Sequence, residues 1–212
     1  MGSHLLHLLT WLSPAFPTGA YAYSHGLEQA VEDRDIGDGD TLRTWIADVL
    51  EHGSGRNDAI LLRHSYRSGE YAALNELAIA VASSRERRIE TLDQGSAFVA
   101  AAVAWKPPAS LPPRVAYPVA VGALAASHGI DEDATTAAFL QAVTGNLISA
   151  AVRLVPLGQS TGLRVLASLP PIILQVTQDT RTATLDDIGG CAFRSELAAM
   201  RHETQYTRLF RS

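Results

Sequence analysis

Apolar residues recur along this chain with the spacing of an α-helix rather than that of a β-strand. Leu42, Trp45 and Val49, for example, fall on one helical face. Residues 172–177 are rich in β-branched side chains, but a single strand would have no partner, so a helix that continues past the preceding proline pair is favoured. The pattern predicts an all-α fold: one globular helical bundle of about nine helices, with a flexible C-terminal tail.

The domain organisation follows from the breaks in this pattern. Residues 106–118 contain five prolines, yet they are too apolar and too short for an interdomain linker, so we interpret them as a crossover loop. We therefore expect one helical domain over residues 5–200 and a tail over residues 201–212. The opening residues 1–4, Met-Gly-Ser-His, resemble an expression-vector scar.

Composition and charge exclude several classes of protein. The 212 residues carry 17 basic and 22 acidic side chains, a net charge of −5, whereas nucleic-acid binders usually show a basic excess. The single cysteine, Cys191, closes no internal disulfide and supplies no cysteine-based zinc cage. The apolar segment 5–12 is shorter than a membrane span, which needs about 20 residues, and it lacks the basic leader of a signal peptide. We expect a cytoplasmic protein that binds neither nucleic acid nor membrane.

The side chains that could carry chemistry form no recognisable catalytic or metal-binding motif. None of the seven histidines has the H-x-x-x-H spacing that places two imidazoles on one helix face. The chain has no G-x-S-x-G elbow and no Gly-rich turn that would cradle phosphate. The run Arg-Glu-Arg-Arg at 85–88 is interpreted as a solvated helix face with internal ion pairs. The sequence thus predicts no catalytic residue, no metal ligand and no cofactor.

Two segments do not fit a purely structural interpretation. Residues 13–28 place aromatic side chains and two prolines in a rigid loop, which either plugs one end of the bundle or forms a partner surface. Residues 201–212 alternate Arg with large apolar side chains, although chain ends are usually polar. Tyr, Phe and Arg are the side chains that anchor interfaces. We expect this tail to become ordered on a partner; docking on its own domain is the alternative.

The same two segments carry a resemblance to a known family. The run WLSPAFPTGAYAYSHGLE at 11–28 resembles the N-terminal signature of the urease accessory protein UreF family. The ending HETQ at 202–205, followed by RLFRS at 208–212, is similar to the C-terminal signature of that family. Its central pattern is matched, in the right order, by Arg85-Glu86, Gln94-Gly95, Asn146, Arg153 and the PLGQ run at 156–159.

The resemblance implies an all-α protein that forms a homodimer and has no catalytic or metal site of its own. It implies three partners: a UreD/UreH-type accessory protein, a UreG-type GTPase and the urease apoprotein. The chain would act as a maturation chaperone that scaffolds these partners for GTP-dependent nickel insertion. Regulation of the GTPase is a further implied role, for which the sequence singles out no arginine.

Carried over by position, the resemblance assigns residues to two sites. The partner-binding tail comprises Tyr206, Arg208, Leu209, Phe210, Arg211 and Ser212, which would dock on the UreD/UreH-type protein. The N-terminal signature loop comprises Pro17, Gly19, Tyr23, Ser24, His25 and Glu28. Two other functions stay open. One is a helical hydrolase that uses Ser24, His25 and Glu28; the other is a carrier that binds nickel directly through His25 and His202.

Overall fold

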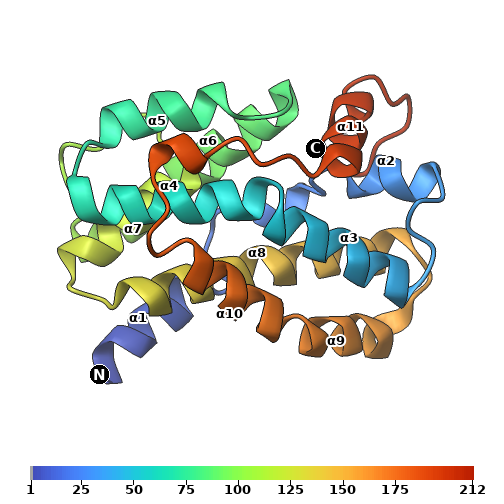
Figure 1. Cartoon of the computed structure of the whole chain (residues 1–212), viewed down its shortest axis with the longest axis horizontal. Helices are drawn as coiled ribbons and strands as arrows, with labels where there is room; N and C mark the ends of the chain where they lie inside the picture. The colour runs from blue at the N-terminus through green and yellow to red at the C-terminus, as the bar shows by residue number, and fades with distance from the viewer. Residues whose placement is uncertain (1) are drawn as a thin grey trace.

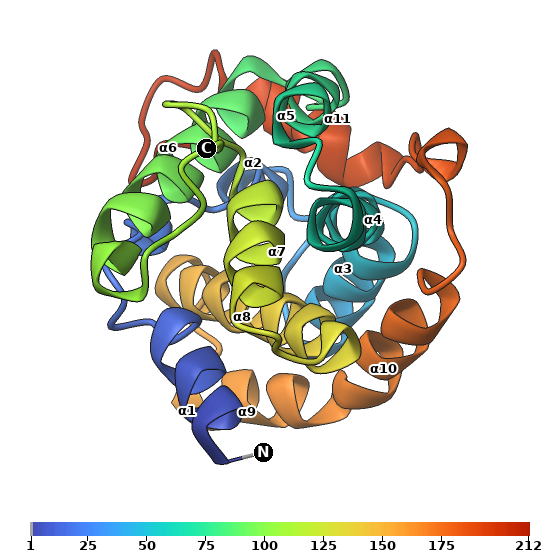
Figure 2. The ribbon, with the colours of Figure 1, turned by 90° about the vertical axis from the view of Figure 1, so that its left-hand side faces the viewer.

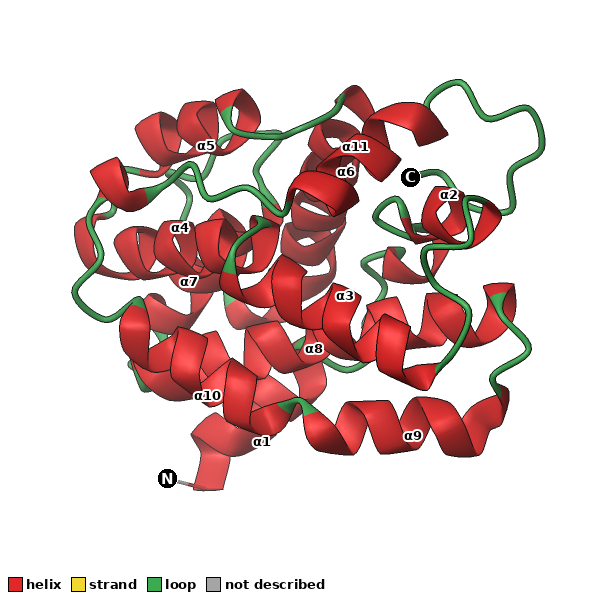
Figure 3. Ribbon diagram, turned by 45° about the vertical axis from the view of Figure 1, so that its right-hand side comes forward, coloured by secondary structure: helices red, strands yellow, loops and turns green. Residues whose placement is uncertain are grey.

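Helices form the regular secondary structure of residues 2–212, the part of the chain that the computed structural model describes (Figure 1). These residues contain no strand, which confirms the all-α prediction (Figure 3). The α-helices are α1 (Gly2–Trp11), α2 (Leu27–Glu32), α3 (Gly39–Glu51), α4 (Ser54–Ser68), α5 (Tyr71–Ala80), α6 (Arg85–Ala101), α7 (Tyr117–Ser127), α8 (Glu132–Leu154), α9 (Gly158–Ser168), α10 (Pro170–Asp179) and α11 (Phe193–His202). Three 3₁₀ helices lie between them: η1 (Ala20–Ala22), η2 (Ala102–Trp105) and η3 (Leu185–Asp187).

The described residues thus form eleven α-helices, against about nine expected. The difference arises because some helices end at positions where the apolar pattern does not change. Pro170 and Pro171 lie in the first turn of α10, where the missing N–H would be unpaired in any case, and they separate α10 from α9. Residues 172–177, for which a strand was considered, are helical and belong to α10.

α7 is the centre of the apolar core (Figure 2). Its residues 117–125 are all buried, and it packs against α4, α6 and α8. A helix that is apolar on every side is stable only when other elements surround it. Two glycines permit this close packing. A Cβ on Gly122 would lie 2.3 Å from the carbonyl oxygen of Leu62, and a Cβ on Gly95 would lie 2.0 Å from that of Val115.

α8 is the one helix among residues 2–212 that is long and apolar enough to cross a membrane, judged by length and composition. Inside the bundle it contacts α2, α4, α7, α9 and α10. Phe139, Leu140 and Leu147 are among its buried side chains. These contacts account for its apolar character, because a helix at the core of a globular bundle needs the same composition.

α11 returns to the beginning of the chain. It packs against α2 and α6, so the C-terminal segment lies beside the loop that follows α1 (Figure 3). This contact between the two sequence signatures positions the candidate site.

Replacing Gly95 with Ala should lower the free energy of unfolding by about 1–3 kcal/mol, because the added methyl group overlaps backbone atoms rather than a movable side chain. Gly145→Ala is the matched control inside α8, where no atom lies within 4 Å of the added Cβ. That control should raise the free energy of unfolding by about 0.5–1 kcal/mol. Urea denaturation followed by circular dichroism measures both changes. Equal effects of the two substitutions would contradict the packing argument.

Candidate partner-docking site

The loop between α1 and α2 turns into the interior of the molecule through two residues with left-handed backbone. His25 has φ 59° and Gly26 has φ 77°. A Cβ at Gly26 would lie 2.7 Å from the backbone nitrogen of Ala199 in α11. Only glycine lets the chain pass this close to α11 with that backbone conformation. The turn therefore places the end of the signature loop directly against the C-terminal helix.

The C-terminal tail is folded against its own chain, which corrects the expectation of a flexible tail that becomes ordered on a partner. The backbone N–H of Arg211 donates to the carbonyl oxygen of Ala22 at 2.8 Å, and that of Ser24 donates to the carbonyl oxygen of Ser212 at 2.8 Å. The Ser24 hydroxyl donates to the same Ser212 oxygen. The Phe210 ring is buried, with 6% exposed. Backbone pairing and aromatic burial together hold the segment in place.

The carboxylate of Glu28 is the main anchor of the tail. One of its oxygens accepts the N–H of Leu209 at 2.7 Å, and the other accepts the N–H of Phe210 at 3.0 Å. The second oxygen also lies 3.2 Å from Nε2 of His202. Hydrogen bonds to an ionised acceptor are stronger than those between neutral groups. Glu28 of α2 therefore joins the tail to the last residue of α11.

His202 lies between two carboxylates and has no exposed surface. Its Nδ1 is 2.6 Å from one oxygen of Glu86 in α6, and the other Glu86 oxygen accepts a hydrogen bond from Arg208 at 2.7 Å. Each ring nitrogen of His202 therefore faces a carboxylate oxygen. The resulting chain of polar contacts runs from Glu28 through His202 and Glu86 to the tail.

A second carboxylate, that of Glu90 in α6, holds the end of the tail. It accepts the Ser212 hydroxyl at 2.7 Å and lies 2.5 Å from the Arg87 guanidinium. Burial opposes ionisation, but Arg87 holds the pKa of Glu90 well below its ordinary value. Burial, followed by the charge of Arg87, lowers the pKa of His25. The Nε2 atom of that ring is hydrogen-bonded to the Ser54 hydroxyl at 2.8 Å.

The predicted tail residues divide into an outward and an inward set. The exposed side chains are those of Tyr206, Arg208, Leu209 and Arg211, and the buried ones are those of Phe210 and Ser212. From residue 209 to residue 212 the side chains alternate between the two sides, as they do in an extended chain. The segment can therefore pack against its own domain with one side while the other side faces solvent.

The predicted N-terminal residues also fall into two groups, one that contacts the tail and one that does not. Hydrogen bonds to the tail are made by Ser24, His25 and Glu28. Tyr23 is buried close by and donates its hydroxyl to Asp93 at 3.2 Å, and burial raises the pKa of Tyr23. Pro17 and Gly19 do not reach the tail: they line a separate cavity between the loop and α8.

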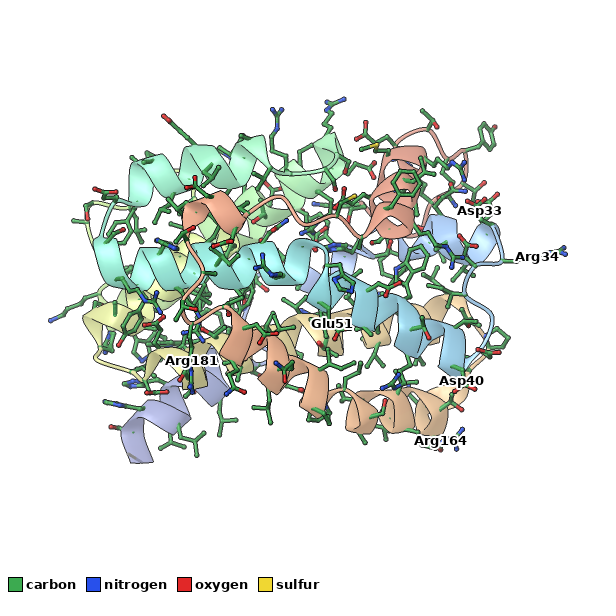
Figure 4. All side chains as sticks on the ribbon, in the orientation of Figure 1. Asp33, Arg34, Asp40, Glu51, Arg164 and Arg181 are labelled. Atoms are coloured by element: carbon green, nitrogen blue, oxygen red, sulfur yellow. The ribbon has the colours of Figure 1, made fainter. Side chains whose placement is uncertain are left out.

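The edge of the site carries exposed polar contacts. Arg201 lies 3.3 Å from Asp33 at the end of α2, and Gln205 donates to Glu32 at 2.7 Å. The neighbouring Arg34 extends away from the ribbon into solvent (Figure 4). Exposed pairs of this kind contribute little to stability, so the buried carboxylates dominate the attachment of the tail.

The structure corrects the interpretation of run 85–88 as a solvated face. Its first and last residues are exposed, but Arg87 is only 8% exposed and Glu90, just beyond the run, is 7% exposed. One indication was available in the sequence. Positions 87, 90 and 94 follow helical spacing and lead to Phe98, an apolar residue on the same side of the helix. That pattern is typical of a polar layer next to a core.

The geometry favours neither of the two other functions considered. Ser24, His25 and Glu28 form no nucleophile and base pair, because each engages a different group: the Ser212 carbonyl, the Ser54 hydroxyl and His202, respectively. Within residues 2–212, no group of three or more His, Cys, Asp or Glu side chains is arranged to hold a metal ion. His202, the second histidine of the proposed nickel carrier, faces a carboxylate with each nitrogen.

Asp58 of α4 lines the same cavity as Arg87, and the sequence did not predict a role for it. This cavity has a volume of about 30 Å³ and is also lined by Ser54 and Asn57. Desolvation raises the pKa of Asp58 to about 7, although the charge of Arg87 acts in the opposite direction. This carboxyl group therefore titrates near neutral pH.

The fold and the site define a class: an all-α protein whose C-terminal segment is held by buried carboxylates against an N-terminal loop. A family model described as UreF matches residues 36–170, more than half of the chain. The chain is 50% identical to the urease accessory protein UreF of Rhodopseudomonas palustris (strain TIE-1), over 98% of this chain and 92% of that protein. It is 51% identical to the UreF of Cereibacter sphaeroides (strain KD131 / KCTC 12085), over 100% of both.

A third relative, the UreF of Methylorubrum populi (strain ATCC BAA-705 / NCIMB 13946 / BJ001), is 47% identical over 98% of both proteins. The chain belongs to the UreF family of urease accessory proteins, as the two signatures indicated. Membership implies a role in urease maturation.

Glu28→Gln should loosen the tail, because a neutral amide accepts weaker hydrogen bonds than a carboxylate and faces His202 less favourably. We expect the amide hydrogens of Leu209 and Phe210 to exchange at least about tenfold faster, which corresponds to about 1.4 kcal/mol. Glu32→Gln is the control, since it removes the same charge from the exposed contact with Gln205. Hydrogen exchange by NMR measures both, and equal exchange rates in the two variants would contradict the anchoring role.

Asp58→Asn should change the pH dependence of stability. The unfolded chain ionises Asp58 near pH 3.8 and the folded chain near pH 7, so folding takes up a proton between these values and the parent loses stability as the pH rises through this window. The amide has no such dependence. The melting temperature of the variant minus that of the parent should therefore grow from about pH 4 to about pH 7 and then level off. Asp48→Asn, which removes a carboxylate that is exposed, is the control, and an equal pH dependence in the two variants would contradict the assignment to Asp58.

Proposed function

We propose that this chain is a maturation chaperone that acts through protein contacts. It scaffolds a UreD/UreH-type accessory protein and a UreG-type GTPase for GTP-dependent nickel insertion into the urease apoprotein. It works in the cytoplasm, as a homodimer, and is not an enzyme. Nickel is the cargo of the complex, and its ligands belong mainly to the partners. Membership in the UreF family supports the maturation role from which this proposal starts.

The observation that carries the proposal is that a tail bound to its own domain exposes large side chains to solvent. Leu209 is 77% exposed although its backbone N–H is held by Glu28, and Tyr206, three residues before it, is fully exposed. A side chain on a fixed backbone loses less conformational entropy on docking than one on a mobile chain. Tyr is among the residues that most often dominate binding energy. The anchored tail therefore offers a preformed contact to a partner.

The charged groups around these side chains support the same interpretation. Arg208 and Arg211 are exposed on either side of Leu209. Apolar anchors surrounded by polar or charged groups are the common arrangement of protein interfaces. A partner surface that places carboxylates opposite these two arginines and an apolar pocket opposite Leu209 would match the tail.

Replacing Tyr206 and Leu209 together with Ala should weaken binding of the UreD/UreH-type partner by at least about 30-fold, because a dominant interface side chain contributes about 2 kcal/mol or more. Both side chains are exposed, so the helical content should not change. Isothermal titration calorimetry measures the affinity, and circular dichroism checks the fold. Reconstituted urease activation at fixed nickel and GTP should fall with the affinity.

The matched control is Leu163→Ala with Leu174→Ala, two leucines that are 63% and 61% exposed on α9 and α10. These helices lie on the opposite side of the bundle from α11 (Figure 1), so the control should bind the partner as the parent does. Unchanged affinity of the Tyr206 and Leu209 variant would reject the tail as the docking surface. Equal urease activation with and without the chain would reject the maturation role itself.

A further inference from the structure

A cavity of about 320 Å³ lies between the loop that follows α1 and helix α8. Residues 12–21 of the loop form one wall, and residues of α8 with Tyr117 form the other. Its volume is at the lower end of the range of small-molecule pockets, about 300–1,000 Å³. The docked tail does not contribute to this lining, so the cavity is separate from the partner-docking site.

The lining of this cavity is uncharged. None of its fifteen residues is Asp, Glu, Lys, Arg or His, whereas the cavity beside α9 carries Asp38, Arg43 and Arg164, and the one beside Cys191 carries Asp48 and Arg194. A charged group transferred from water into such a site would lose its hydration without gaining a partner. The cavity therefore selects a neutral ligand.

Gly145 of α8 gives independent evidence that the space is kept open. A glycine in a helix interior costs about 0.5–1 kcal/mol relative to alanine. Close packing explains Gly95 and Gly122, but no heavy atom lies within 4 Å of a Cβ built on Gly145. The missing side chain instead leaves room in the cavity that Gly145 lines. A side chain added at this position would begin in open space.

The walls favour a flat ring with a hydrogen-bonding group. Phe16, Tyr21 and Tyr117 are among the lining residues, and aromatic rings pack on one another with favourable offset or edge contacts. The Asn146 side chain lies in the same lining and can both donate and accept hydrogen bonds. Burial raises the pKa of Tyr117. Its hydroxyl therefore stays protonated and can donate a hydrogen bond.

We propose that this cavity is a binding site for a neutral aromatic ring that carries a hydrogen-bonding substituent, a ligand of the phenol class. The inference does not depend on the partners proposed above. Such a ring can come from a free small molecule or from a tyrosine side chain of another protein. The chemistry that the cavity recognises is the same in both cases.

The test uses the full chain and p-cresol as the probe, with binding followed by saturation-transfer NMR and titration. We expect saturable binding that Gly145→Leu weakens at least about tenfold, because the added side chain occupies the cavity. Ala142→Leu, at a second lining position, should act in the same way. Gly37→Leu is the control at an exposed glycine with equally open space, and it should leave the affinity unchanged.

Two further probes define the ligand. Benzylammonium has a ring of the same size with a positive charge and should bind at least about tenfold more weakly than p-cresol. N-acetyl-tyrosinamide binding as tightly as p-cresol would identify a protein side chain as the source, whereas its exclusion would identify a free small molecule. Failure of p-cresol to bind, or equal binding by the parent and by correctly folded Gly145→Leu and Ala142→Leu variants, would overturn the proposal.

Discussion

The buried carboxylate of Glu28 joins three segments that lie far apart in the sequence: the start of α2, the end of α11 and the tail. It is bonded to two backbone N–H groups of the tail and lies within hydrogen-bond distance of His202. A buried charge is costly unless it is hydrogen-bonded, and the loss of one partner leaves an unsatisfied group. The positions of α11 and the tail are therefore coupled, because each supplies contacts that the same carboxylate requires.

This polar layer differs in physical character from the apolar core next to it. Around α7 the helices are held by close contacts at Gly95 and Gly122, where no added atom fits. Between α2, α6 and α11, Glu28 is instead held by two backbone N–H groups and His202, and Glu90 by the Ser212 hydroxyl and the Arg87 guanidinium. Apolar packing is not directional, whereas each contact of the polar layer requires a specific donor. The core therefore sets the shape of the bundle, and the polar layer determines which side of the tail faces inward.

The sequence predicted the helices well, because their apolar spacing is a local property. The two signatures also indicated the family, which the relatives confirm. The sequence did not predict that Glu28 would meet His202, 174 positions away, because a single sequence contains no information on which distant polar groups pair. Arg87 was assigned to solvent for the same reason. Charged residues are seldom buried without partners, and these partners become visible only in the folded structure.

The tail was misjudged for a different reason. Its composition is that of an interface, and from composition alone an interface with another protein cannot be told from one with the chain itself. The alternation at Leu209, Phe210, Arg211 and Ser212 shows that one extended segment can serve both purposes. Phe210 and Ser212 hold the segment on its own domain, and the intervening side chains stay available. Because Leu209 is exposed while Phe210 and Ser212 are buried, a change to the Leu209 side chain alters recognition without removing the buried contacts of the segment. That separation lets a short segment be fixed in place and remain exposed at the same time.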